Sequence, residues 1–112
     1  MNNRIATCGM LALLIFIGCN SIPNVSYKPG LYEGAGNGYR GIIRVLVHLS
    51  EGGIEDIEIQ ESYEDLYAME AMEELLELAL EFNTADLDAI SGATISSRGF
   101  LTALEEALNK GR

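Results

Sequence analysis

The amino-acid sequence predicts an α+β fold: a three-stranded antiparallel meander followed by two helices packed on one face of the sheet. Two observations support this prediction. Residues 30–61 alternate apolar and polar residues between glycine-containing turns, as half-buried strands do. Residues 64–82 and 96–109 instead repeat apolar residues at helical spacing. A chain of 112 residues in this order fits one domain.

The three strands are expected between short turns. Asn37-Gly38 is a strong hairpin signal, because both residues tolerate positive φ, and Glu51-Gly52-Gly53 marks the second turn. The second strand places four apolar residues on one face: Ile43, Val45, Val47 and Leu49. The third strand directs Ile57 and Ile59 to the same side. Short turns between consecutive strands make an antiparallel meander.

Each predicted helix carries one apolar stripe. In the first helix, which should end near Asn83, we expect the stripe to be core and not a binding groove. Its members are Met69, Met72, Leu76, Ala79 and Leu80. The second helix should run from about Ser96 to Asn109, with Gly111 able to end it. Its core face is Phe100, Ala103, Leu104, Ala107 and Leu108.

Residues 1–18 are predicted to be a lipoprotein signal peptide. The apolar run 10–17 is shorter than the roughly 20 residues that span a bilayer and suits a signal peptide. Phe16-Ile17-Gly18-Cys19 resembles a lipobox, which implies a lipid on Cys19 and a location on the extracytoplasmic face of the cell membrane. An uncleaved N-terminal anchor is the alternative. Residues 19–29 then form a tether, and residues 30–112 form the domain.

The composition excludes several functions. Seventeen acidic residues against seven basic ones give a net charge of −10, which argues against nucleic-acid binding and against charge-driven adhesion to anionic membranes. With Cys8 removed and Cys19 acylated, no thiol remains for a disulfide. One histidine and no free cysteine also argue against a metal site.

The segment 88–97 carries the chemistry. It is a run of small and hydroxyl residues that leads directly into a helix. Helix N-termini expose unpaired N–H groups, and a glycine lets the backbone approach a ligand, so the pattern suits a phosphate. The alternative is purely structural, with Ser91-Gly92 as a turn and Ser96 or Ser97 as the helix N-cap.

Asp88-Ala89-Ile90-Ser91-Gly92-Ala93-Thr94-Ile95-Ser96 resembles the flavinylation motif of the FMN-binding domain family. That domain occurs in the sodium-pumping NADH:quinone reductase, in the Rnf complex and in stand-alone extracytoplasmic proteins. The pattern is an aspartate, two residues, Ser or Thr, then Gly-Ala-Thr, one residue and a further hydroxyl residue. The resemblance extends over residues 30–110, including Tyr32-Glu33-Gly34 and the helix after the motif.

The resemblance implies that FMN is joined through its phosphate to the hydroxyl of Thr94 by a flavin transferase that uses FAD. Gly92 and Ala93 would give that enzyme access to the loop. Asp88 would shape the loop or be recognised by the transferase. The hydroxyl groups expected to donate to phosphate oxygens are those of Ser91, Ser96 and Ser97.

The isoalloxazine ring also needs a surface. The glycine-rich stretch from Gly34 to Tyr39 is the expected one, with Tyr39 or Tyr32 stacking on the ring; a plain hairpin with two surface tyrosines is the alternative. No nucleophile elbow or Ser-x-x-Lys motif occurs, so an electron carrier is favoured over a complete enzyme. Its partners would be redox proteins or a quinone-linked complex. The competing function is a lipid-anchored binding or structural module that carries no flavin.

The Gly18-Cys19 junction yields a first testable prediction. Replacing Cys19 by alanine removes the sulfur that would accept the lipid, so Cys19→Ala should stay unprocessed or be released from membranes. Cell fractionation with mass spectrometry of the N-terminus measures both effects, and Cys8→Ala is the control. Normal processing and membrane association of Cys19→Ala would argue against a lipoprotein.

Overall fold

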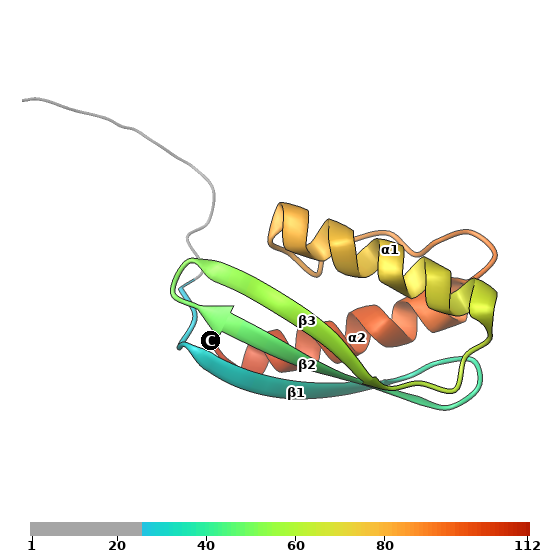
Figure 1. Ribbon diagram of the computed structural model, residues 1–112, viewed down its shortest axis with the longest axis horizontal. Helices are drawn as coiled ribbons and strands as arrows, with labels where there is room; N and C mark the ends of the chain where they lie inside the picture. Colours follow the sequence, from blue (N-terminus) through green and yellow to red (C-terminus); the bar gives the residue numbers. More distant parts are fainter. Residues whose placement is uncertain (1–25) are drawn as a thin grey trace, which may run out of the picture.

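The computed structural model describes residues 26–112, and the predicted signal peptide and Cys19 lie outside this range. The chain forms the strands β1 (Gly30–Asn37), β2 (Ile42–Ser50) and β3 (Gly53–Glu61), then the helices α1 (Leu66–Phe82) and α2 (Thr94–Lys110). The strands pair antiparallel in the order β1-β2-β3 (Figure 1). This confirms the predicted α+β meander. Within residues 26–112, no helix is both long and apolar enough to cross a membrane.

One face of the sheet is buried and the other is open. The four predicted residues of β2 are fully buried, whereas Arg44 and His48 on the opposite face are exposed. Helix α2 packs on β1 and β2, and α1 packs on β3 and on α2 (Figure 1). Both helices therefore contribute to the layer over one face of the sheet, as predicted.

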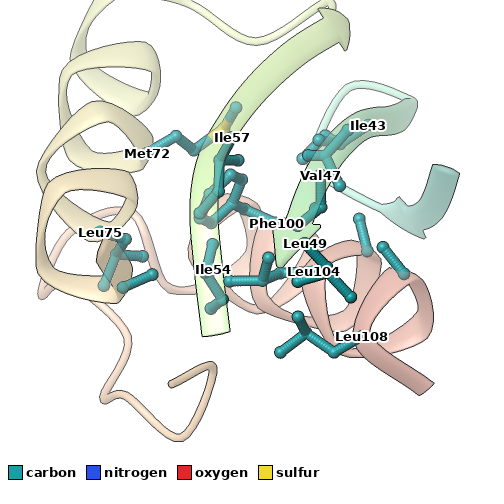
Figure 2. Close-up of a cluster of buried hydrophobic side chains, with 14 of the residues drawn as sticks. Ile43, Val47, Leu49, Ile54, Ile57, Met72, Leu75, Phe100, Leu104 and Leu108 are labelled. Carbon is teal, nitrogen blue, oxygen red and sulfur yellow. The ribbon is translucent and has the colours of Figure 1, made fainter. Parts of the chain in front are cut away.

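Phe100 lies at the centre of the core (Figure 2). All five predicted core residues of α2 are at most 1% exposed, which confirms that face. In α1 the buried stripe is rotated relative to the prediction: Leu75 is fully buried, while Met69 and Leu76 are half-buried. Met72 is fully buried against the sheet, so the methionine-containing stripe is core, as expected.

A β-bulge in β3 brings Ile54 into the core in addition to the two predicted isoleucines. His48 pairs with Asp56 but Leu49 pairs with Ile54, so Glu55 is an extra residue on β3. The bulge lets both Ile54 and Ile57 point into the core. Ile59 pairs with the buried Val45 and packs against the core as predicted, although it is only half-buried and lies beside a second register shift.

The glycines of β1 pack against α2 and do not form a loop, which corrects the prediction for Gly34 to Tyr39. A Cβ atom on Gly34 would lie 1.9 Å from the carbonyl oxygen of Ala103, and one on Gly36 would lie 2.1 Å from that of Gly99. The absence of side chains thus lets the helix backbone lie directly on the strand. Strand β1 extends to Asn37, and these glycines serve packing.

The hairpin between β1 and β2 also differs from the predicted Asn-Gly turn. Asn37 pairs with Ile42, and residues 38–41 form a longer turn in which the N–H of Gly38 donates to the oxygen of Gly41 at 2.7 Å. The positive φ falls at Gly41 and not at Asn37 or Gly38. The hairpin is therefore correct, but its loop has four residues.

Asn83 ends α1 as predicted, in the left-handed conformation with φ 56°. Its side-chain oxygen accepts from the N–H of Ile54 at 2.7 Å, which joins the end of α1 to the start of β3. At the N-terminal side, Tyr27 is buried and the N–H of Lys28 donates to the oxygen of Gly111 at 2.7 Å. The last residues of the segment predicted as tether are thus part of the folded domain.

The β1–α2 contact yields a prediction about stability. Gly34→Ala should lower the free energy of unfolding by about 1–3 kcal/mol, because the methyl group would force the strand and helix apart. Gly52→Ala is the matched control: its Cβ has only the Ser50 hydroxyl nearby, at 4.0 Å, and should change stability by no more than about 0.5 kcal/mol. Urea denaturation measures both. Equal stability of the two variants would show that β1 and α2 can separate without cost.

Candidate functional site

A cleft of about 400 Å³ opens at the end of the sheet where the β1–β2 turn lies, and Thr94 lines it. We call it the Thr94 cleft. The β1–β2 turn contributes Tyr39 and Arg40. The loop before α2 contributes residues 92–93, and the first turn of α2 contributes residues 94–96. The start of α1 completes the wall with Glu64, Asp65, Tyr67 and Ala68. Three segments distant in the sequence therefore meet around the predicted attachment residue.

Thr94 is the first residue of α2 and is exposed, so the helix begins two residues before the predicted Ser96. The N-cap is Ala93, which makes no side-chain cap hydrogen bond, and the N–H of Ser97 makes the first helical bond to the oxygen of Ala93 at 2.8 Å. Neither Ser96 nor Ser97 is the N-cap, so that part of the structural alternative is wrong. Ser91-Gly92 does form a turn, in which the N–H of Ala93 donates to the oxygen of Ile90 at 3.0 Å. The first backbone N–H groups of α2 lie beside Thr94 and are not bonded by a capping side chain.

The serines of the motif have different environments. Ser97 is fully buried, and its oxygen accepts from the N–H of Ile90 at 3.1 Å, so it holds the loop before α2. Ser96 is 3% exposed and donates its hydroxyl to Glu64. Ser91 is exposed, and its carbonyl oxygen accepts from the hydroxyl of Tyr67 at 3.1 Å. Asp88 is exposed and does not line the cleft.

Glu64 connects the two sides of the cleft. Its carboxylate accepts from the backbone N–H groups of Tyr39 and Arg40, both at 2.9 Å, and from the hydroxyl of Ser96. Glu64 does not stand out in the sequence, because it is one of many glutamates in an acidic stretch and its partners lie 24 to 32 residues away. No local signal could have distinguished it.

The aromatic residues are only partly those expected. Tyr39 lines the cleft and is 72% exposed. Tyr32 lies at the other end of β1, where its hydroxyl donates to the oxygen of Lys28 at 2.8 Å, so it does not line the cleft. Tyr67, which was not expected from the sequence, lines the Thr94 cleft and is 57% exposed. The cleft thus has one tyrosine from the turn and one from α1.

A second acidic side chain lies near the turn but outside the cleft. Glu61 accepts from Arg44 at 2.8 Å and from the hydroxyl of Tyr63 at 2.5 Å. The hydrogen bond from Tyr63 is the larger cause that lowers the pKa of Glu61, and the hydrogen bond from Arg44 is the next. The carboxylate of Glu61 in turn raises the pKa of Tyr63. Because its folded-state pKa is lowered, Glu61 stabilises the fold above its ordinary pKa, and this contribution is lost as the pH falls through the lowered value.

The donor set suits an anionic ligand with an aromatic part. Uncapped N–H groups at the start of α2 attract a phosphate, and Arg40 adds a cation to the wall. The two tyrosines offer surfaces for a planar ring. Among residues 26–112, no group of three or more His, Cys, Asp or Glu could hold a metal ion. The residues present therefore fit a flavin nucleotide better than a metal.

The loop before α2 yields a further prediction. Gly92 has φ +89°, and a Cβ there would lie 2.8 Å from the hydroxyl oxygen of Tyr67. Gly92→Ala should cost about 1–3 kcal/mol of stability through backbone strain and this clash. In a Tyr67→Phe background the 2.8 Å contact is removed, while the backbone strain and a 3.2 Å contact with the ring remain, so the cost should be smaller. Thermal denaturation of the four proteins measures this, and an equal cost in both backgrounds would contradict the contact.

Comparison with known proteins agrees with this geometry. The model of the FMN-binding domain matches residues 38–109, which include the turn, α1 and the Thr94 loop. The chain is 35% identical over 86 residues to "NADH:acrylate oxidoreductase" of Vibrio harveyi, covering 76% of this chain and 9% of that protein. It is 31% identical over 84 residues to an uncharacterized protein of Treponema pallidum (strain Nichols), covering 74% and 23%. The chain spans less than a quarter of either relative. Its match to the domain model shows that this chain belongs to the FMN-binding domain family.

Proposed function

We propose that this protein is an electron carrier whose FMN is attached through its phosphate to the hydroxyl of Thr94. The observation that carries the proposal is the position of Thr94: exposed, first in α2, and inside a cleft with a cation and two tyrosines. Family membership supports FMN as the cofactor. The covalent bond is inferred from the motif and from the accessible hydroxyl.

The residues of the cleft have separate roles in this proposal. The uncapped N–H groups of α2 and the guanidinium of Arg40 would bind phosphate oxygens. Ser97 supports the loop from within, because its buried oxygen already accepts from Ile90. Ser91 remains available to a phosphate because it is exposed. When bound, the flavin supplies the redox chemistry, and the protein orients it and shields one side from water.

Attachment needs a second protein. A threonine hydroxyl is a weak nucleophile at neutral pH and requires a base or a metal ion. Glu64, the carboxylate that contacts Ser96 of the motif, already accepts three hydrogen bonds, and Asp88 of the motif does not line the cleft. We therefore propose that a flavin transferase transfers FMN from FAD to Thr94 and releases AMP. The exposure of Ser91, Gly92 and Thr94 is consistent with access by such an enzyme.

We further propose that the carrier is held at the extracytoplasmic face of the cell membrane by a lipid on Cys19. There it would exchange electrons with redox proteins or a quinone-linked complex. An open cleft suits this role, because the ring edge can approach a partner without a conformational change. Cys19 lies outside the described residues, so this step rests on the lipobox resemblance.

The attachment site is tested by Thr94→Val. Co-expressed with a flavin transferase, the wild type should carry one covalent FMN per chain, seen as fluorescence after a denaturing gel. Thr94→Val should carry none, yet its stability should change by no more than about 0.5 kcal/mol, because residue 94 is exposed. Thr102→Val, at an exposed site further along α2, is the matched control and should keep its flavin.

Two results would contradict the proposal. Peptide mapping that locates FMN on Ser91 or Ser96 would refute the assignment to Thr94. A wild-type protein that stays colourless with an active transferase would instead favour the binding or structural module without flavin. The purified domain mixed with FAD and magnesium alone should stay colourless after denaturing gel filtration, because the two carboxylates that line the cleft, Glu64 and Asp65, already accept hydrogen bonds. Self-attachment would show a catalytic group that these contacts do not account for.

A further inference from the structure

Glu64 is the one side chain that bonds both to the β1–β2 turn and to the first turn of α2 among the described hydrogen bonds. Its Oε1 accepts from the N–H of Tyr39, and its Oε2 accepts from the N–H of Arg40, both at 2.9 Å. The hydroxyl of Ser96 bonds to Oε1 from the other side. A single carboxylate thus fixes the turn relative to the helix that begins with Thr94.

The backbone of Asn37 and Gly38 at the base of the turn packs on Gly99 of α2, and the carboxylate of Glu64 holds the tip of the turn. The backbone hydrogen bond from Gly38 to Gly41 closes the turn but does not fix where the turn lies. Gly38 packs against Glu64 so closely that a Cβ there would lie 3.0 Å from the carboxyl carbon. Tyr39 and Arg40 have exposed side chains, so contacts of their backbone with Glu64 determine their position beside Thr94.

The part of the cleft lined by Tyr67 is held by a different set of contacts. The hydroxyl of Tyr67 donates to the oxygen of Ser91 at 3.1 Å, and the ring lies over Gly92, where a Cβ would be 2.8 Å from that hydroxyl. Tyr67 is the second residue of α1. The wall formed by Tyr67 is therefore held by α1 and the Thr94 loop, while the wall formed by Tyr39 is held by Glu64.

We propose that Glu64 is a positioning residue for the flavin: by fixing the β1–β2 turn against α2, it holds Tyr39 beside the isoalloxazine ring, in the cleft that Tyr67 also lines. This inference rests on the proposed attachment at Thr94. Glu64 does not touch the ring itself and acts through Tyr39. An aromatic side chain that stacks on a flavin lowers its fluorescence and its exposure to water, so the emission of the bound flavin reports the position of Tyr39.

The experiment uses the flavinylated protein and measures covalent flavin on a denaturing gel, native flavin emission and quenching by iodide. Glu64→Ala should keep its covalent flavin, with brighter emission and stronger iodide quenching than the wild type. Glu64→Gln, which keeps the size but has one acceptor oxygen, should give a smaller change of the same kind. Glu61→Gln is the matched control: it removes a carboxylate whose partners, Arg44 and Tyr63, lie outside the cleft, and should leave emission unchanged.

A double-mutant cycle separates positioning from a general structural effect. Tyr39→Leu alone should raise the emission, and Glu64→Ala should add nothing in that background, because Glu64 acts through Tyr39. Wild-type emission in both Glu64 variants would overturn the proposal, and so would an equal increase in the Tyr39→Leu background. If Glu64→Ala does not fold, Glu64→Gln carries the same comparison. Absence of covalent flavin from the wild type itself would refute the attachment at Thr94 instead.

Discussion

The contact between β1 and α2 is the constraint on which the rest of the structure depends. Gly34 and Gly36 let the helix backbone lie on the strand, and Gly99 does the same from the helix side, where a Cβ would lie 2.5 Å from the oxygen of Asn37. Gly99 therefore marks the end of the sheet. Thr94 precedes it by five residues, so at about 1.5 Å per residue α2 begins about 7.5 Å beyond this edge. The cleft exists because the helix extends past the sheet.

The glycines of this domain thus have distinct physical roles. Those of β1 and α2 remove side chains from a helix–strand contact and affect stability throughout the fold. Gly92 instead adopts φ +89° in the loop before α2 and leaves room for Tyr67. A glycine-rich stretch near a cofactor motif therefore does not by itself mark a cofactor surface, because the same residues can serve packing.

The domain is small relative to the two proteins with which it was compared. Both relatives are far longer than the aligned region, so a segment similar to this chain occurs as part of larger proteins. The site is built from one end of the domain, with the hairpin turn, the start of α1 and the start of α2. The described part of this chain therefore brings three separate segments together around the cleft.

The sequence by itself determined the order of elements, the buried faces of β2 and α2 and the family, because each depends on local periodicity or a contiguous motif. Only the tertiary structure decided that Tyr67 and Glu64 join the Thr94 cleft and that Tyr32 does not. Glu64 and Ser96 are 32 residues apart, and their contact arises from how α1 and α2 pack on one sheet. The bulge at Glu55 depends likewise on strand pairing. Contacts between distant segments leave no periodic signal in a single sequence, whereas side-chain alternation does.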